Sequence, residues 1–533
     1  MTSLNAIRLL SAINLSWILW QPLAAQVHFE ALCDTTPWLC SRNVAGLTAL
    51  PDDVRTNYAE TYFQKDDGGW GDYYASPDSY VFGARTASYY RVNSRLVLSG
   101  SVSYSNFQGK DMTGSVWLEP DDQPFDIVEM DPQYAGTKNR EKYNLMGALG
   151  IELGHGLSLG ACVDFTSANN AKRRDLRSQN KLMDLDAGGG ILWAKGFVQL
   201  GLSYRYRRSL EELLFKTYGT TGIFYASLID YGASFGVSEY SDANGLTDED
   251  EERPMLSERH SVSLQVGLSQ GSTKFVNEGW LEWRDGYYGK RSLFTPVFME
   301  HSGNAWGYEG RITWQQRHSV SYRVTGSHLQ NWQNLFSYVN QGGGLNEYVY
   351  HGQLKTRGQR TLGAEAGYKL YSQAWVHQVK AGYHERRLTA SFYPFYRRQQ
   401  IRYEEVALAS RRQWYSGQHD WSVELQLGYQ KGGGTMAEDG SYDATGEGTS
   451  DDAGSALIRT SLITLPTALQ QHYDYLTASQ GNVGLNLLYG RRLYADRVRI
   501  FALLSARYQR AWSVTADVEN HHQTVSFSLG CTF

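Results

Sequence analysis

The chain has 533 residues, a formal net charge of -5 and a mean hydropathy of -0.46. This polar average excludes a bundle of membrane helices, each of which needs about 20 consecutive apolar residues, and the weak negative charge gives no basis for nucleic-acid binding. The 37 Tyr, 15 Trp and 54 Gly, with only 11 Pro, favour many paired strands with aromatic belts.

The first segment, residues 1–25, has the pattern of a signal peptide. Arg8 precedes an apolar run from Leu9 to Trp20, and small residues follow up to Ala25. The run is short for a membrane-spanning helix, so a retained anchor is the less favoured alternative. The sequence therefore predicts export.

Residues 26–54 show no clear periodicity and are expected to form an N-terminal periplasmic segment. Within it, Cys33 and Cys40 enclose a six-residue loop. In an exported chain this spacing makes them candidates for a local disulfide, with two unpaired thiols as the alternative. Cys162 and Cys531 are isolated on separate strands and are interpreted as small packing residues.

Strand patterns fill residues 55–533, joined alternately by short turns and by longer polar connections. In the first clear strand Leu96, Leu98, Val102 and Tyr104 share one face, and serines occupy most of the other. Short turns are expected at residues 154–156, 194–196, 270–271, 315–316, 372–373 and 416–417, with a longer connection near 490–496.

Charge distribution distinguishes a membrane barrel from a soluble sheet. No charged residue occurs on the apolar side of the six strand faces that begin at Leu96, Leu157, Val198, Trp421, Val498 and Val525. A lipid-facing Arg or Lys costs about 2 to 4 kcal/mol at the bilayer midplane. Charged residues on the opposite faces fit a wet lumen, and the candidate lumen-lining residues are Asp184, Arg205, Arg311, Arg323, Glu365, Lys380, Glu424 and Arg499.

Aromatic residues indicate the direction of the strands. Strands that leave a short turn tend to end in an outward aromatic before a long connection: Tyr104, Phe165, Tyr206, Tyr383, Tyr429 and Tyr508. This pattern predicts an aromatic belt at the long-loop rim, with short turns periplasmic and long loops extracellular.

The expected fold is all-β, a transmembrane antiparallel barrel of roughly 18 strands. Counts of 14 or 16 are the alternatives, because the strands near 56–64 and 401–411 are weakly patterned. The sheet must close on itself, since lipid tolerates no open strand edge.

The last ten residues alternate strictly between apolar and small or polar side chains. Phe527, Leu529 and the terminal Phe533 lie on the apolar side. This stretch resembles the C-terminal assembly signal of bacterial outer-membrane barrels. The resemblance implies that the barrel-assembly machinery and outer-membrane lipid are partners.

Long loops are expected at about 107–141, 166–181, 208–258, 327–358 and 431–471. The 208–258 loop is long enough to fold inward and narrow or plug the lumen, but an external cap is the favoured alternative. The acidic residues of 431–471 do not fit an EF-hand, and Glu519 to His522 lack further ligands, so no metal or cofactor is predicted. Three Gly-x-Ser-x-Gly matches lack the following helix that a hydrolase needs, so the chain is not expected to be an enzyme.

Two of these loops also carry a resemblance to a known family. The segments are Asp111 to Ser115, Pro124 to Glu129, Ala135 to Lys138 and Asn169 to Arg177, followed by Asn180, Met183 and Asp184. They resemble uncharacterised outer-membrane barrels of the Bacteroidales type. The resemblance implies a Gram-negative outer membrane and companionship with TonB-dependent import systems.

Within that region, five charged residues form a loop polar cluster: Lys172, Arg173, Arg174, Asp175 and Arg177. Binding of an anionic ligand is one interpretation, and a charge network that braces the loop is the favoured alternative. The whole chain is interpreted as a porin-like barrel for passage or capture of a small solute, and a role accessory to a TonB-dependent import system is one form of this hypothesis. The rival hypothesis is a non-conducting structural or docking barrel that serves an outer-membrane partner.

Overall fold

The structure is a computed structural model. It describes residues 32–34, 36–51, 56–69, 73–129, 131–218, 222–241, 245–247, 253–291, 296–340, 346–393, 395–438, 467–493, 498–512, 514 and 520–533. The predicted signal peptide and most of the acidic 431–471 stretch lie outside these residues.

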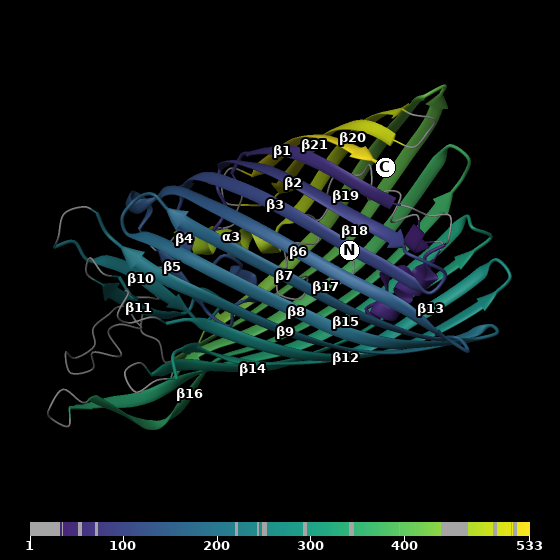
Figure 1. Ribbon diagram of the computed structural model, residues 1–533. Coiled ribbons are helices and arrows are strands. Elements are labelled where there is room, and N and C mark those ends of the chain that lie inside the picture. Colours follow the sequence, from purple (N-terminus) through teal and green to yellow (C-terminus); the bar gives the residue numbers. More distant parts are fainter. Residues whose placement is uncertain are drawn as a thin grey trace.

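Within the described residues, 18 antiparallel strands form one closed ring (Figure 1). Each wall strand pairs with the next along the chain, and β1 (Thr56–Asp67) closes on β22 (His521–Thr532). The others are β2 (Asp78–Arg91), β3 (Leu96–Met112), β6 (Gly136–Gly154), β7 (Leu157–Lys172), β8 (Arg177–Lys195), β9 (Val198–Lys216), β12 (Met255–Gln270), β13 (Thr273–Gly289), β14 (Val297–Trp314), β15 (His318–Asn340), β16 (Asn346–Tyr371), β17 (Trp375–Phe392), β18 (Phe395–Ser416), β19 (His419–Glu438), β20 (Ser479–Leu493) and β21 (Val498–Trp512). The predicted barrel of 18 strands is confirmed, and the counts of 14 and 16 are wrong.

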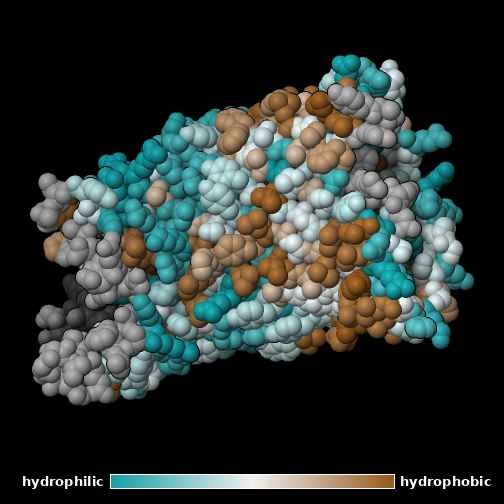
Figure 2. Space-filling view, viewed as in Figure 1, coloured by the Kyte–Doolittle hydropathy of each residue, from teal (hydrophilic) through white to brown (hydrophobic). Residues whose placement is uncertain are grey.

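Alternating side chains give each wall strand one face toward lipid and one toward the lumen. On β22 the side chain of Phe527 is 45% exposed, whereas that of Ser528 is 1% exposed. Figure 2 shows hydrophobic residues gathered in a broad band on the outer surface, next to a more hydrophilic long-loop end. Because an exposed apolar band on a closed ring is stable in lipid, the protein is an outer-membrane barrel.

The two rims of the ring differ, as predicted. Tight turns join the strands at one rim, where Gly196, Gly271 and Gly417 adopt positive φ angles of 61°, 59° and 60°. At the other rim, residues 113–135 and 217–254 form long connections that leave the wall.

Two expected loops are mostly strand. β7 and β8 are joined by residues 173–176 alone, and β15 and β16 by residues 341–345. β16 has 26 residues, whereas about 9 to 11 suffice to span a membrane. The strands therefore continue well past the length that a membrane requires, and register shifts between Asn331 and Trp332 and between Leu335 and Phe336 interrupt the alternation that marks a strand in the sequence.

The two long connections contribute a second, four-stranded sheet. Its strands are β4 (Gly114–Ser115), β5 (Asp126–Glu129), β10 (Tyr225–Asp230) and β11 (Gly236–Ser241), in the order β11-β10-β5-β4. Phe125, Ile127 and Phe235 of these connections share a buried cluster with the wall residues Tyr288 and Leu388. The connections therefore fold inward, as one of the two alternatives for the 208–258 loop proposed, and are not an external cap.

Short helices complete the fold. They are η3 (Pro37–Cys40), η4 (Val44–Ala49), η5 (Pro120–Asp122), η6 (Pro132–Tyr134) and α3 (Thr467–Thr477). The Asn43 side chain accepts a hydrogen bond from the Ala45 amide and so caps η4. No helix among the described residues has the length and apolar character needed to cross a membrane.

Candidate functional site

Residues 32–51, here called the N-terminal plug, lie inside the ring of strands at its short-turn end (Figure 1). η4 packs against β6, β7 and β8. Thr48 Oγ1 lies 3.2 Å from the hydroxyl of Ser158. Ser158 is on the inner face of β7, opposite to the face that carries the exposed Val163. The sequence predicts a periplasmic segment here and does not predict that it lies inside the ring of strands.

Glycines on the inner face let the plug approach the wall backbone closely. A Cβ atom added at Gly160 would lie 2.3 Å from the Ala45 amide nitrogen, and one at Gly190 would lie 2.1 Å from the Asn43 side-chain oxygen. Any larger residue at either position would therefore displace the plug.

Asn43 is the most densely bonded residue of the plug. Its amide nitrogen lies 2.8 Å from the carbonyl oxygen of Ile191 and 3.1 Å from the Gln265 side-chain oxygen. Trp38 also donates a hydrogen bond, from its indole N–H to Gln199. These contacts reach strands β8, β9 and β12, so the plug is held to several neighbouring wall strands.

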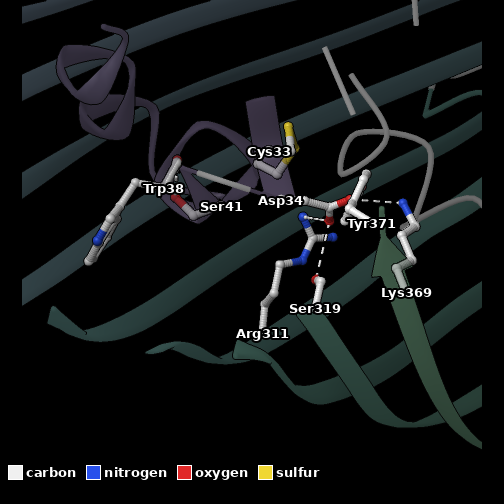
Figure 3. Close-up of a disulfide and its surroundings, with 9 residues drawn as sticks. Cys33, Asp34, Trp38, Ser41, Arg311, Ser319, Lys369 and Tyr371 are labelled. Atoms are coloured by element: carbon white, nitrogen blue, oxygen red, sulfur yellow. Dashed lines mark hydrogen bonds and ion pairs between the residues drawn. A yellow bond between two sulfur atoms is a disulfide. The ribbon is translucent and has the colours of Figure 1, made fainter. Parts of the chain in front are cut away.

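Asp34 forms the first charged attachment of the plug. Figure 3 shows its carboxylate between Arg311, Ser319, Lys369 and Tyr371 of the wall. Arg311 lies 2.9 Å and Lys369 3.0 Å from the carboxylate. Burial alone would raise the pKa of Asp34, but Lys369 and Arg311 hold that pKa below its usual value. The carboxylate is therefore charged at neutral pH.

Arg42 forms the second charged attachment. Its guanidinium stacks 3.9 Å from the ring centre of Trp280 and lies 3.8 Å from Glu278 and 3.7 Å from Glu309. The Arg42 amide also donates to Glu278 at 3.0 Å. Because the Arg42 side chain is 3% exposed, removing either partner would leave a buried charge uncompensated.

A disulfide fixes the shape of the plug. Cys33 and Cys40 are bonded, with Cα atoms 5.7 Å apart, and the bond lies next to Asp34 (Figure 3). Cys162 is a buried free thiol on the inner face, 3.5 Å from Arg205. The disulfide links both ends of the first plug turn, so Asp34 and Trp38 are presented to the wall together.

The four-stranded sheet, together with the described residues of 113–135 and 217–254, is here called the loop plug, and it closes the lumen at the long-loop end. Arg397 donates to the carbonyl oxygens of Ala233 and Ser234, both at 3.0 Å. Arg357 donates to the carbonyl oxygen of Pro124 at 3.1 Å. The wall therefore holds this sheet through buried arginines as well as through the apolar cluster.

Asp122 adds a charged anchor to the loop plug. Arg259 lies 2.5 Å and Arg284 3.4 Å from its carboxylate. Burial would raise the pKa of Asp122, but these guanidinium groups lower it to about 2. The anchor is therefore ionised at neutral pH.

All eight candidate lumen residues occupy inner-face register positions, and most are engaged in pairs. Asp184 pairs with Arg207 at 2.6 Å, Arg205 with Asp186 at 3.3 Å, Arg311 with Asp34 at 2.9 Å, and Arg323 with Glu309 at 2.5 Å. Arg499 pairs with Asp420, and Glu424 accepts a hydrogen bond from Gln426. The role of these residues in selectivity stays a prediction.

The remaining two lumen candidates belong to a wetter area, here called the inner patch: Glu365, Lys380, His384 and Glu405. The Glu365 side chain is 40% exposed, and His384 Nε2 lies 3.8 Å from it and 3.6 Å from Glu405. Lys380 is exposed as well. Both signs of charge therefore face lumen water between the two plugs.

The predicted loop polar cluster lies at the ends of β7 and β8. Lys172 is buried and contacts Glu129 of the loop plug at 2.7 Å. Arg177 contacts Asp175 at 2.8 Å, and Arg174 donates to the carbonyl oxygen of Ala135 at 3.1 Å. The amide of Arg173 donates to the Thr137 carbonyl at 2.9 Å. These are contacts of the bracing kind; the anion-binding hypothesis has no test here.

The candidate metal and hydrolase motifs of the sequence can also be compared with the structure. Among the described residues, no three His, Cys, Asp or Glu side chains gather as metal ligands would. Ser234, in one Gly-x-Ser-x-Gly match, lies in the hairpin turn between β10 and β11 with a φ of 57°.

Residues 44–533 match the Family of unknown function (DUF6850). The chain belongs to this family. No curated protein matches the sequence.

Several solved outer-membrane proteins are similar in shape. The FrpB iron transporter (F5-1 variant) of Neisseria meningitidis has a TM-score of 0.42 and 9% sequence identity, and the match covers 92% of this chain and 84% of that one. The outer membrane transporter YddB of Escherichia coli has a TM-score of 0.40 and 8% identity, with 89% of this chain and 80% of that one covered. The ferric-catecholate import receptor Fiu of E. coli K12 has a TM-score of 0.40 and 7% identity, with 91% of this chain and 82% of that one covered. At such low values the likeness says nothing about what this chain binds.

Proposed function

We propose that this outer-membrane barrel captures a small polar solute and passes it through a lumen whose N-terminal plug acts as a gate. The observation that carries the proposal is the way the plug is fastened. Ion pairs at Asp34 and Arg42 and amide hydrogen bonds at Asn43 hold it, and all of these groups would find water if the plug left. Release therefore costs less than release of an apolar filler of equal size.

The inner patch supports capture of a polar solute. Glu365, Lys380 and Glu405 offer both charges on one stretch of wetted wall. Zwitterionic or hydrogen-bonding solutes match such a lining better than apolar ones do. Cooperation with a TonB-dependent receptor is part of the proposal, since a partner acting from the periplasmic side would raise the small fraction of time for which the plug is open.

The loop plug favours a second candidate, a non-conducting barrel that serves as a platform. Among the described residues, the cluster that it forms with the wall contains 18 buried hydrophobic residues, and such a packed core resists opening. In this alternative both plugs are permanent fillers, and the rims present a fixed surface to a partner.

Planar-bilayer recordings separate the two candidates. The host is a full-length variant in which a short Gly-Ser linker replaces residues 217–254, so that the N-terminal plug is the main remaining closure. If the plug is a gate, this host should open briefly, and Asp34→Asn should increase the fraction of time for which it is open. No openings are expected when a disulfide between Thr48→Cys and Ser158→Cys locks the plug. Heat-modifiable gel migration checks that each barrel is folded. A host that stays shut with Asp34→Asn would refute gating and favour the platform.

A further inference from the structure

The outer surface of the barrel has a hollow that neither plug touches. It has a volume of about 800 Å³ and lies over β15 to β19. Four basic side chains line it: Lys355, Arg360, Arg387 and Arg398. Arg360, Arg387 and Arg398 face outward, because their strand neighbours Gln359, Leu388 and Arg397 are buried on the inner face. Lys355 is exposed on the same side, because a register shift between Asn331 and Trp332 reverses the alternation of β16 at that point.

The charges in this hollow are not balanced. Arg360 lies directly opposite Arg387 in the register of β16 and β17, and like charges in that position repel. Arg387 contacts Glu385 at 2.7 Å. Among the described residues, no carboxylate forms an ion pair with Lys355, Arg360 or Arg398. Four cations therefore share one close carboxylate, an arrangement that an anionic ligand would relieve.

Neutral polar side chains lie beside the cations. Thr389, Ser391, Gln330 and Gln400 also line the hollow. Ser391 donates to the Lys355 carbonyl oxygen at 2.6 Å and Gln400 donates to Glu385, so these two would have to exchange partners to bind a ligand. Guanidinium groups bind phosphate oxygens through paired N–H donors, and hydroxyl or amide groups complete such sites. The lining therefore fits a phosphomonoester better than it fits a carboxylate or a neutral sugar alone.

The height of the hollow relative to the membrane points to the source of the phosphate. On β16 Arg360 lies two residues before the exposed Leu362, nearer the long-loop rim, and on β17 Arg387 lies four residues beyond the belt residue Tyr383 toward the same rim. Four residues of strand at about 3.3 Å each, tilted by about 40°, raise Arg387 roughly 10 Å above Tyr383. That height is close to the headgroup layer, which begins where the hydrocarbon ends.

From this charge and position we propose that the hollow binds the phosphorylated headgroup of an outer-leaflet glycolipid, namely the lipid A part of lipopolysaccharide. The acyl chains lie along the apolar band below, next to Leu362 and Val406, while the phosphate sits between Arg360 and Arg387. The site is independent of the lumen and of the proposed gate. A free phosphate has the same headgroup chemistry, so the experiment must separate the two sources.

The test measures lipid retained by the full-length protein. Wild type, Arg360→Gln with Arg387→Gln, and the control Arg412→Gln are exchanged from vesicles containing lipid A into detergent, and bound lipid is counted by native mass spectrometry. Arg412 is a matched control, because it is also exposed and outward on β18 but lies at the short-turn end. We expect wild type and the control to retain lipid A, and the double variant to bind it at least about tenfold more weakly.

Two further arms make the result decisive. Vesicles with enzymatically dephosphorylated lipid A should give no retention, and millimolar inorganic phosphate should compete with lipid A. Equal retention by the double variant and wild type, equal loss in the Arg412→Gln control, or retention without phosphate groups would each overturn the proposal. Saturation by inorganic phosphate without any lipid retention would overturn the lipid assignment.

Discussion

Asp126 and Asp230 lie directly opposite each other in the register of β5 and β10. Both carboxyl groups are buried within the loop plug. Tyr73 donates to Asp126 at 2.6 Å and Ser115 donates to it at 2.7 Å. Two facing acids in one buried sheet repel when both are ionised, so the loop plug should respond to pH.

The first prediction concerns that response. Burial and the neighbouring Asp230 raise the pKa of Asp126 to about 7, against the opposing effect of the Tyr73 and Ser115 hydrogen bonds. Since the unfolded pKa is about 3.9, the protonated form stabilises the folded loop plug at low pH, and that contribution is lost as pH rises from about 4 to 7. Local stability should fall by up to about 3 kcal/mol between pH 5 and 8.

Hydrogen exchange of residues 126–129 and 225–230, corrected for intrinsic rates, measures this change. Asp126→Asn keeps an acceptor for Tyr73 and removes the titration of this one carboxyl group, so its loop plug should lose less stability with rising pH than that of wild type. Asp230, whose pKa burial also raises, accounts for part of what remains. A wild-type loop plug that becomes more stable as pH rises would contradict the assigned direction.

The second prediction compares two neighbours on β18. Leu408 faces lipid with 47% of its side chain exposed, and Ala407 faces the lumen opposite Lys380. Leu408→Arg should destabilise the folded barrel by about 2 to 4 kcal/mol, whereas Ala407→Arg should have a much smaller effect. Urea unfolding in lipid vesicles gives both values. Equal losses would mean that the inner and outer faces are misassigned.

The third prediction concerns Arg42. Arg42→Met leaves Glu278 without its buried cation, so the closed plug should lose about 3 to 5 kcal/mol. Adding Glu278→Gln removes the orphaned charge and should restore part of the loss. The local opening free energy of residues 36–50, from hydrogen exchange, measures each variant. If the loss of opening free energy in the double variant equals the sum of the losses in the two single variants, the two residues do not couple.

The barrel wall was predictable because lipid and water impose opposite rules on alternate residues. The alternation of Val525, Phe527 and Leu529 with small polar residues therefore predicts both that the segment is a strand and which of its side chains face lipid. The ends of β15 and β16 extend past the length that a membrane requires, and two register shifts interrupt their alternation. The sequence therefore predicts a loop where the structure has strands.

The N-terminal plug was not predictable from its own sequence. Its contacts are single hydrogen bonds, such as those of Asn43, and close approaches to wall backbone at Gly160 and Gly190. None of these imposes a period on residues 32–51. The inward glycines of β6, β7, β8, β9 and β12 were the available signal, because a lumen that only holds water has no need of them.

The most direct test of a lumen closed by its own N-terminus is a cross-link between Thr48 and Ser158. Their hydroxyl oxygens are 3.2 Å apart, so Cys at both positions should form a disulfide on mild oxidation of outer membranes. Peptide mass spectrometry should find this link, and the control pair Thr48→Cys with the outward Leu159→Cys should give none. Absence of the first link in a folded barrel, or equal yields from both pairs, would contradict a plug seated inside the ring.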